Sequence, residues 1–315
     1  MSERVRVGLV GVGVIAQTHL QVLADDDRFT LEFTVDPNPG KPVDFRGAQP
    51  PHYETLSAAM ERHDPDLAVI ATPTHTHGAL AIEALSRSSA RVLVEKPLVH
   101  DLDSLARLRA LDGTVDVRGR VFTAHHFAFS PEVRWAAGQI TAHPEWGPAT
   151  GVTMAFYDPY ILLGQHAFDS YGTSWMDSGV NQLSVLARLV DLGSLTSAQE
   201  SEGGVSAWHT VSYNSRGTTG MARLRSDWRT GSSSKETVLT FAESGVELWI
   251  DHTAMTGFAA LGGELIASHG NDGRTPRKIA HYRPLYESLI SPSPDPVLGF
   301  ATSVTIKELH HATPK

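Results

Sequence analysis

A glycine-rich turn near the start of the chain constrains its fold more than any other feature. The apolar segment Arg4–Val10 runs directly into Gly11-Val-Gly13, and residues 15–23 then carry apolar side chains at helical spacing. A strand that enters a helix through such a turn is the start of a βαβ unit. The first glycine permits the tight turn, and the second lets backbone N–H groups approach a pyrophosphate. The sequence therefore predicts a dinucleotide-binding turn.

The helix after the turn strengthens this interpretation. Ala16 stands where the usual fingerprint has its third glycine, which is a recognised variant. The helix offers the positive end of its dipole to an anion. The alternative is a plain strand-to-helix turn, which the surrounding βαβ pattern disfavours. We expect the pyrophosphate to be bound by the turn and the first helical residues, namely Gly11, Gly13, Val14 and Ile15.

Strand and helix patterns continue to alternate through residues 1–122. Further strands are predicted at residues 29–35, 66–71, 91–95 and 116–123, and helices at 53–62, 76–86 and 101–111. Strands that alternate with helices form a parallel, doubly wound sheet. We therefore predict an α/β protein whose residues 1–122 form a Rossmann domain.

An acidic residue at the end of the second predicted strand bears on the choice of dinucleotide. Asp36 lies where a carboxylate can accept hydrogen bonds from the adenosine ribose hydroxyls, and its charge repels a 2′-phosphate. NAD is therefore favoured over NADP. Because Asn38 or Lys41 could turn toward a phosphate, NADP stays open. Asp36 could also act as a simple turn former before Pro37.

Length and composition exclude several classes of function. A chain of 315 residues is long enough for two domains. Its net charge of −9 and lack of a basic run give no reason to expect nucleic acid as a partner. No apolar run is long enough for a membrane span or a signal peptide, so we expect no membrane partner and a cytoplasmic location. The absence of cysteine excludes thiolate chemistry, and the 16 histidines show no metal-binding spacing, so no metal is expected.

The second half of the chain is rich in predicted strands. A helix begins at Ser130-Pro131, and strands are predicted at residues 150–157, 205–213, 220–227, 237–241 and 246–250. A turn at residues 242–245 joins the last two as a hairpin, which implies mostly antiparallel pairing. We predict a second α+β domain at residues 123–315, built on a large open sheet.

Three segments together resemble the glucose-fructose oxidoreductase and inositol dehydrogenase (Gfo/Idh/MocA) family. They are residues 11–20, then Ala71-Thr72-Pro73 with His77 before a helix, then Val94-Glu95-Lys96-Pro97-Leu98. The resemblance implies a sugar-handling oxidoreductase with a nicotinamide cofactor. It further implies that Thr72, Pro73 and His77 line the dinucleotide site, that Glu95 and Lys96 lie beside the nicotinamide, and that Pro97 follows a cis peptide bond.

The same resemblance gives the second domain two tasks. In this family the open sheet covers the nicotinamide pocket with one face and often pairs subunits through the other. A homodimer or homotetramer formed through the C-terminal sheet is therefore expected.

Residues 174–192 contain the candidate catalytic side chains of the second domain. Asp177, Asn181, Ser184 and Arg188 lie within about 60° on a helical wheel, so one polar face marks an otherwise apolar helix. A solvated helix face is the alternative. Asp177 and Asn181, however, match the Asp-x-Gly-x-His signature of the family, with asparagine in place of histidine.

The asparagine changes the expected mechanism, because an amide cannot take up a proton at neutral pH. Lys96 and Asp177 are then the candidate bases. An ordinary lysine is protonated at neutral pH and needs burial or a neighbouring cation to act as a base, whereas an aspartate is already ionised. We hypothesise that Asp177 accepts the proton, or relays it with Lys96, while Asn181 holds a sugar hydroxyl.

The altered signature resembles the galactose and arabinose 1-dehydrogenases, which oxidise aldoses at C1 to lactones. The resemblance places His126 at a sugar-contacting position, and His166 is a further candidate contact. The alternative enzyme oxidises a ring or polyol hydroxyl, with His126 or His166 replacing the missing histidine. A third possibility is a dinucleotide-binding sensor without turnover.

Overall fold

A computed structural model describes residues 4–38 and 43–312 and divides the chain into two units. The first unit comprises Met1–His125 and Tyr282–Lys307, and the second comprises His126–His281 and Glu308–Lys315. Lys41, one of the two residues considered for a 2′-phosphate, lies outside the described residues. The N-terminal unit thus begins as the sequence predicted, but it also takes up a segment from near the C-terminus.

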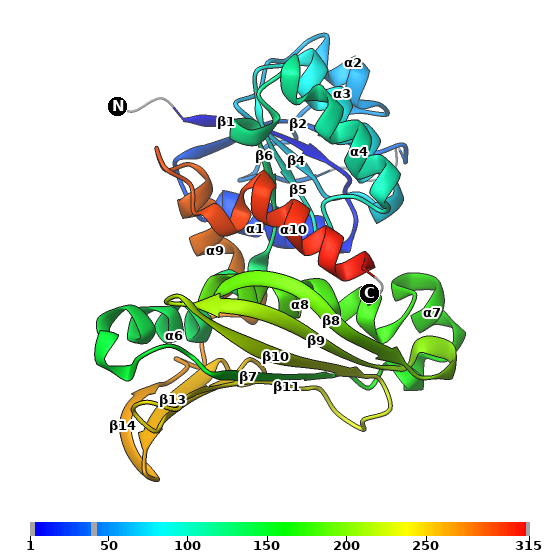
Figure 1. Ribbon diagram of the computed structural model, residues 1–315. Helices are drawn as coiled ribbons and strands as arrows, with labels where there is room; N and C mark the ends of the chain where they lie inside the picture. Colours follow the sequence, from blue (N-terminus) through cyan, green and yellow to red (C-terminus); the bar gives the residue numbers. More distant parts are fainter. Residues whose placement is uncertain (1–3, 39–42, 313–315) are drawn as a thin grey trace. The chain divides into compact units, whose positions relative to one another are not determined.

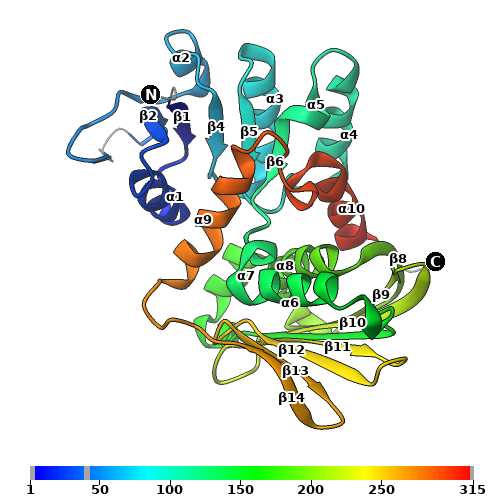
Figure 2. The same cartoon turned by 90° about the vertical axis from the view of Figure 1, so that its left-hand side faces the viewer.

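The first unit contains a parallel sheet. Among the described residues it has six strands in the order β3-β2-β1-β4-β5-β6, which is the strand order of a Rossmann fold (Figures 1 and 2). Every neighbouring pair is parallel, as predicted. The strands are β1 (Val5–Val10), β2 (Phe29–Val35), β3 (His52–Tyr53), β4 (Leu67–Ile70), β5 (Arg91–Val94) and β6 (Val121–Thr123).

The helices of this unit include α1 (Val14–Ala24), α2 (Leu56–Met60), α3 (His77–Arg87), α4 (Leu102–Ala110), α5 (Val117–Arg120) and the 3₁₀ turns η1 (Thr74–Thr76) and η2 (Leu111–Gly113). Two predicted boundaries were wrong. The predicted strand at 116–123 starts as helix α5, because the Asp116 carboxylate caps it by accepting from the Gly119 N–H at 2.8 Å. The predicted helix at 53–62 is shorter, because Thr55 caps α2 and Tyr53 belongs to β3.

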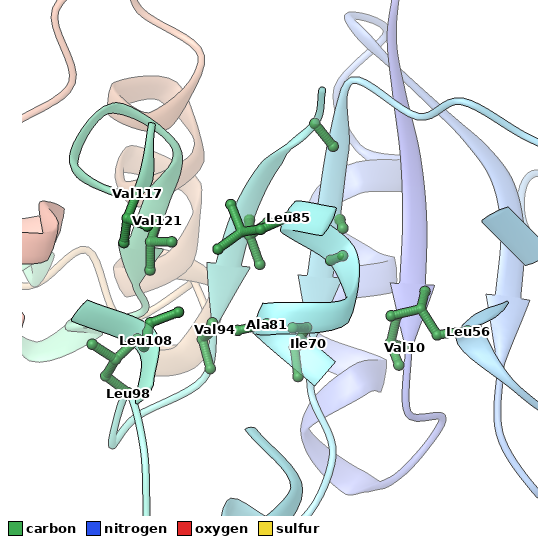
Figure 3. Packing of buried hydrophobic residues seen from close by; sticks show 14 of the residues in the cluster. Val10, Leu56, Ile70, Ala81, Leu85, Val94, Leu98, Leu108, Val117 and Val121 are labelled. Carbon is green, nitrogen blue, oxygen red and sulfur yellow. The ribbon is translucent and has the colours of Figure 1, made fainter. Parts of the chain in front are cut away.

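Buried apolar side chains from both ends of the chain form the core of the first unit. Val10, Ile70 and Val94 from the central strands belong to one buried cluster with Ala81 and Leu85 of α3 (Figure 3). Parallel strands covered on both faces carry such continuous apolar runs. Phe300 and Val304 of α10 (Phe300–His311) belong to the same cluster.

The C-terminal segment departs from the predicted domain 123–315. Residues 282–307 belong to the first unit and comprise most of α9 (Arg277–Leu289), the 3₁₀ turn η7 (Pro296–Leu298) and the first part of α10. The apolar face of α10 is buried in the core of that unit, which local sequence patterns cannot reveal. The predicted boundary between residues 122 and 123 lies three residues before the observed one.

The second unit is built on a mostly antiparallel sheet, as predicted. Its described residues form eight strands in the order β14-β13-β12-β11-β7-β10-β9-β8, of which only β7 and β10 pair in parallel. The strands are β7 (Gly151–Tyr157), β8 (Asp191–Glu200), β9 (Ser206–Ser215), β10 (Thr218–Asp227), β11 (Ser234–Phe241), β12 (Val246–Asp251), β13 (Thr256–Leu261) and β14 (Glu264–His269).

Three of these strands were not predicted from the sequence. β13 and β14 add a hairpin at one edge, and β8 forms the opposite edge. β8 has no fully buried residue, so it lacks the alternating pattern of a half-buried strand. Its first two residues, Asp191 and Leu192, had been predicted as the end of a helix.

Helices cover one face of the second sheet. The helical segments of this unit are η3 (His126–Phe129), α6 (Pro131–Ala142), η4 (Pro144–Trp146), η5 (Tyr160–Leu163), α7 (Gln165–Tyr171), α8 (Ser174–Leu189) and η6 (Glu202–Gly204), and α6 and α8 pack against the strands. Figure 1 shows α6 and α8 on one side of the strands. Buried and exposed residues alternate along β10 and β12, which is typical of a sheet with one covered face. Within residues 4–38 and 43–312, none of the helices has the length and apolar character of a membrane span, and the cytoplasmic location stays a prediction.

Candidate functional site

The glycine turn has the geometry that an anion site requires. Gly11 has φ +90°, and a Cβ atom there would lie 2.7 Å from the Ala71 carbonyl oxygen, so only glycine fits. A Cβ atom on Gly13, by contrast, would meet nothing within 4 Å among the described residues. Gly13 is the N-cap of α1, where the structure shows no capping side chain, and the next residue, Val14, is 85% exposed. The first N–H groups of α1 are therefore available to a phosphate.

Asp36 lies directly beside this turn. Its Oδ2 accepts a hydrogen bond from the Val12 N–H at 2.9 Å, and its Oδ1 accepts one from the Asn38 N–H at 2.9 Å. The side chain that the sequence assigned to the ribose is thus held against the glycine turn at the carboxyl end of β2. This is where an open α/β sheet binds its ligand.

The Thr-Pro turn after β4 and the Lys-Pro turn after β5 are joined by His77. Its Nδ1 lies 2.8 Å from the Pro97 carbonyl oxygen and its Nε2 lies 2.9 Å from that of Thr72. The Lys96–Pro97 peptide bond is cis, as the family resemblance implied. Burial lowers the pKa of His77, although the two carbonyl groups oppose that shift.

His77 therefore differs from the expectation that it lines the cofactor site. Its side chain is 1% exposed and both ring nitrogens face backbone carbonyl groups of the protein. His77 therefore joins the two turns through its contacts with their backbone carbonyl groups. Thr72 lies in the first of these turns, where its hydroxyl is 2.7 Å from that of Thr76, which donates in turn to the Pro73 carbonyl at 2.8 Å.

Glu95 belongs to a buried chain of polar side chains beneath the Lys-Pro turn. Its Oε1 lies 3.0 Å from His19 Nε2 and accepts from the Tyr282 hydroxyl at 2.6 Å. His19 Nδ1 lies 2.7 Å from the Tyr286 hydroxyl, which extends the chain to α9. Burial favours the neutral acid, but the hydrogen bonds and charge of His19, with Tyr282, outweigh it and hold the pKa of Glu95 below its ordinary value.

The buried network has a structural role that the sequence did not reveal. Glu95 was expected beside the nicotinamide, yet its side chain is 7% exposed and points into the network. His19, on the other side of the hydrogen bond to Glu95, is 0% exposed. The network fixes α1, the end of β5 and α9 relative to one another within the first unit. Lys96, the next residue, is half-buried at the start of the turn.

This network predicts a pH-dependent stability. Because the folded pKa of Glu95 is depressed, its ionised form stabilises the protein above the unfolded pKa of about 4.3, and that contribution is lost as pH falls through the folded pKa. We expect Glu95→Gln to lower the free energy of unfolding by about 3 kcal/mol at pH 7. Urea unfolding at a series of pH values should show the difference from wild type shrinking below about pH 4. The exposed Glu54→Gln serves as the control, and a difference independent of pH would contradict the assignment.

In the second unit, α8 presents the Asp-x-Gly-x-Asn segment. The Thr173 hydroxyl caps this helix by accepting from the Met176 N–H at 3.2 Å. Asn181 is 8% exposed and its Nδ2 donates to the Asp177 carbonyl oxygen at 3.3 Å, while Asp177 itself is half-buried. A Cβ atom on Gly179 would lie 2.6 Å from the ring of Trp175, so the glycine of the motif is required by packing.

The polar face predicted on this helix is not a solvated surface. Ser184 is 1% exposed and donates to the Asn181 carbonyl at 2.7 Å, and the Arg188 guanidinium lies over the ring of Phe129 at 5.4 Å. The face therefore packs against η3. Asp177 is the acidic residue of this face, and it is half-buried.

A group of ionisable residues near Asp177 was not predicted from the sequence. Lys235 forms a buried ion pair with Asp158, and the Ser233 hydroxyl donates to the same carboxylate at 2.8 Å. Burial and the charges of Asp177 and Asp158 raise the pKa of Tyr160, so its hydroxyl stays protonated. Arg277 lies within electrostatic reach of Asp158 and Tyr160. We call Asp158, Tyr160, Lys235 and Arg277 the Asp158 cluster.

A sequence signal for this cluster existed in the strand pattern. Lys235 stands at an inward-facing position of β11, in line with the buried residues Thr237 and Leu239. A lysine in such a position is paired or functional. Strand β11 was predicted to start only at residue 237, so the pattern was not recognised.

The two histidines assigned to the sugar differ in their surroundings. His126 Nδ1 lies 3.1 Å from Nδ1 of the buried His281, so one ring must donate to the other. His166 is exposed on α7. Within the described part of the chain, no group of three or more His, Cys, Asp or Glu side chains could hold a metal ion.

Comparison with known proteins shows what the N-terminal part of the chain is similar to. Residues 5–126 match the Gfo/Idh/MocA family model, described as an oxidoreductase family with an NAD-binding Rossmann fold. The rhizopine catabolism protein MocA of Rhizobium meliloti is 31% identical over 94 residues, which span 30% of this chain and 29% of that protein. The family match is thus confined to the N-terminal part of the chain, and the match to the curated relative spans less than a third of either protein.

Solved structures extend the similarity to both units at the level of the fold. An oxidoreductase domain protein from Kribbella flavida has a TM-score of 0.78 at 15% identity, covering 99% of this chain and 96% of its own. The WlbA dehydrogenase of Bordetella pertussis, solved with NADH and UDP-GlcNAcA, scores 0.71 at 18% identity over 92% and 88%. A UDP-N-acetylglucosamine 3-dehydrogenase of Acidithiobacillus ferrooxidans scores 0.72 at 18% identity over 98% and 95%. At these identities the similarity shows a shared fold across both units.

Proposed function

We propose that this chain is a nicotinamide-dependent sugar dehydrogenase of the Gfo/Idh/MocA family that oxidises C1 of an aldose to a lactone. The observation that carries the proposal is the half-buried Asp177 on α8, followed by Asn181 where the family most often has a histidine base. The family match over residues 5–126 and the dehydrogenases of the same fold support the reaction class. The galactose and arabinose 1-dehydrogenases are the branch whose motif the chain resembles.

The first unit fits a nicotinamide dinucleotide. The uncapped start of α1 and the open space beside Gly13 suit the pyrophosphate, while Asp36 suits the adenosine ribose. Thr72 and Pro73 form the next turn at the same edge of the sheet. When bound, the nicotinamide supplies the acceptor for a hydride.

The protein must handle the other product of the oxidation, the O1 proton. As hydride leaves C1, the O–H bond at O1 breaks and its electron pair forms the C=O bond of the lactone. We assign the proton to the Asp177 carboxylate, directly or in a relay with Lys96. The Asn181 amide can hold a sugar hydroxyl by hydrogen bonds, but it cannot take the proton.

A panel of aldoses, polyols and inositols with NAD and NADP tests the function. Absorbance at the wavelength of the reduced nicotinamide follows turnover, and a lactone trap with hydroxylamine identifies the product. Reduction with aldoses and a lactone product is the expected result. Binding of NAD without turnover on any sugar would overturn the proposal and support a dinucleotide-binding sensor.

Oxidation of a ring or polyol secondary hydroxyl is the second candidate. The contact between His126 Nδ1 and His281 Nδ1 favours it, because it orients a half-buried imidazole that can accept a proton. The fold similarity to a UDP-N-acetylglucosamine 3-dehydrogenase is compatible with oxidation of a secondary hydroxyl. A keto sugar as product, in place of a lactone, would identify this reaction.

The position of Asp36 predicts a preference for NAD. Its carboxylate lies against the glycine turn, where a 2′-phosphate would meet its negative charge. We expect kcat/KM to be higher with NAD than with NADP. Asp36→Asn should lower the ratio of the NAD value to the NADP value by about 10-fold or more. Steady-state kinetics with both cofactors measure the ratio, and Asp27→Asn, at an exposed acidic site after α1, is the control. An unchanged ratio in Asp36→Asn would refute the assignment.

We also propose that the outer face of the second sheet joins copies of this chain into a dimer or tetramer. Trp249 and Phe258 stack on neighbouring strands with ring centroids 5.8 Å apart, and both are more than one-third exposed. Val238 pairs with Trp249 on the same face, which makes an apolar patch without a helix over it. Light scattering during size exclusion should show an oligomer, and the double substitution Trp249→Ser with Phe258→Ser should release monomers. A monomeric wild type at micromolar concentration would refute it.

A further inference from the structure

Arg277 occupies an unusual position in the second unit. It is the first residue of α9, its side chain is half-buried, and its guanidinium lies over the face of the Phe127 ring at 5.0 Å. Burial lowers the pKa of Arg277, but a guanidinium stays protonated at any physiological pH. A full positive charge is therefore held against an aromatic surface within the Asp158 cluster.

The guanidinium has no acceptor of its own among the described residues, where the structure gives it neither a hydrogen bond nor an ion pair. Two other arginines of the unit, Arg225 and Arg229, both bond to Asp227. Five N–H donors in a half-buried position, without an acceptor in the part of the chain that the structure describes, are well suited to an acceptor from outside.

The acidic groups near Arg277 are already engaged. Asp158 is paired with Lys235 and accepts from Ser233. Glu132 accepts from the Ser130 hydroxyl at 2.5 Å and lies 3.0 Å from His252 Nδ1. Within the described residues, Arg277 is therefore a cation whose charge is balanced through space, by Glu132, Asp158 and Asp251.

The shape and charge of the Arg277 guanidinium favour one kind of ligand group. A planar guanidinium matches a carboxylate or a phosphate with two parallel hydrogen bonds. The negative charges of Asp158 and Glu132 nearby disfavour a dianion, so a singly charged carboxylate fits better than a phosphate. A neutral sugar hydroxyl would use at most one of these donors effectively.

We propose that Arg277 binds a carboxylate of the substrate, which makes a sugar acid such as a hexuronate the preferred substrate class. The inference rests on the proposed sugar dehydrogenase function, because Lys235 lies within electrostatic reach both of Arg277 and of the Asp177 that we assign to the proton. The aromatic face of Phe127 fixes the guanidinium plane, so that the carboxylate meets a preformed fork.

Paired substrates test this proposal on the intact enzyme. Galacturonate is compared with galactose, glucuronate with glucose, and glucose 6-phosphate supplies the phosphate arm. Wild type should turn over a uronate with kcat/KM at least about 10-fold above that of the matching neutral aldose. Equal or higher efficiency with the neutral sugar would overturn the proposal, and a preference for the phosphate would overturn the choice of carboxylate.

Substitutions of the arginine separate binding from chemistry. Arg277→Gln should raise KM for the uronate by about 10- to 100-fold with little change for the neutral aldose, and Arg277→Lys should fall between, because it keeps the charge but loses the fork. Arg274→Gln, at an exposed arginine three residues earlier, is the matched control. An equal loss with both sugars would contradict a role in carboxylate binding.

A direct binding measurement distinguishes failure of the proposed dehydrogenase function from failure of the proposed carboxylate site. If no sugar reduces the cofactor, calorimetry with the NAD-loaded protein measures binding of galacturonate and galactose directly. Uronate binding that is lost in Arg277→Gln and kept in Arg274→Gln would uphold the anion site without turnover. Equal binding of both sugars, or none, would overturn it.

Discussion

Asp177→Asn should lower kcat by about 10²- to 10⁴-fold, the range over which a positioned general base contributes to catalysis. The asparagine side chain has nearly the same shape but cannot take the proton that leaves O1. Because Asp177 is half-buried and its helix is capped by Thr173, the substitution should leave the fold intact. Steady-state kinetics on the true substrate, with a thermal melt of each variant, measure both effects.

A neighbouring acidic residue gives the matched control. Asp169 is exposed on α7 and accepts from Gln165 Nε2 at 3.0 Å, so Asp169→Asn should retain normal turnover. Near-normal kcat in Asp177→Asn would show that another group is the base. A large loss in Lys96→Met together with a normal Asp177→Asn would assign that role to the lysine.

Gly13→Ser should weaken NAD binding by about 10- to 100-fold without loss of stability. Gly13 has extended backbone angles at the N-cap of α1, where serine is a better cap than glycine. The new side chain would fill the open space beside the turn and bond the N–H groups that a pyrophosphate requires. Fluorescence titration with NADH measures the affinity and a melt measures stability.

Substitution of the other glycine of the turn, Gly11, should lower stability, whereas substitution of Gly13 should lower cofactor affinity. Gly11→Ser places a side chain at φ +90° and against the Ala71 carbonyl, so it should lower the melting temperature whether or not cofactor is present. If Gly13→Ser bound NADH as tightly as wild type, the pyrophosphate would not lie at this turn.

Several parts of the fold could be predicted because local sequence determines them. The turn at Gly11 and Gly13, the parallel strands β1, β2, β4 and β5, and the helix that carries Asp177 all have apolar residues at the spacing of their secondary structure. The prediction failed where capping side chains overrode the pattern, as Asp116 does at α5. It also failed at β8, where an exposed edge strand has no buried face to produce a pattern.

The sequence by itself therefore determined the Rossmann unit, its glycine turn and the chemical character of Asp177 and Asn181. Only the tertiary structure decided which groups meet. The partner of Glu95 on α9 is Tyr282, 187 residues later in the chain, and Lys235 of β11 pairs with Asp158, the residue after β7. The physical reason is that buried polar groups must find partners wherever packing brings them, and local periodicity carries no record of those long-range contacts.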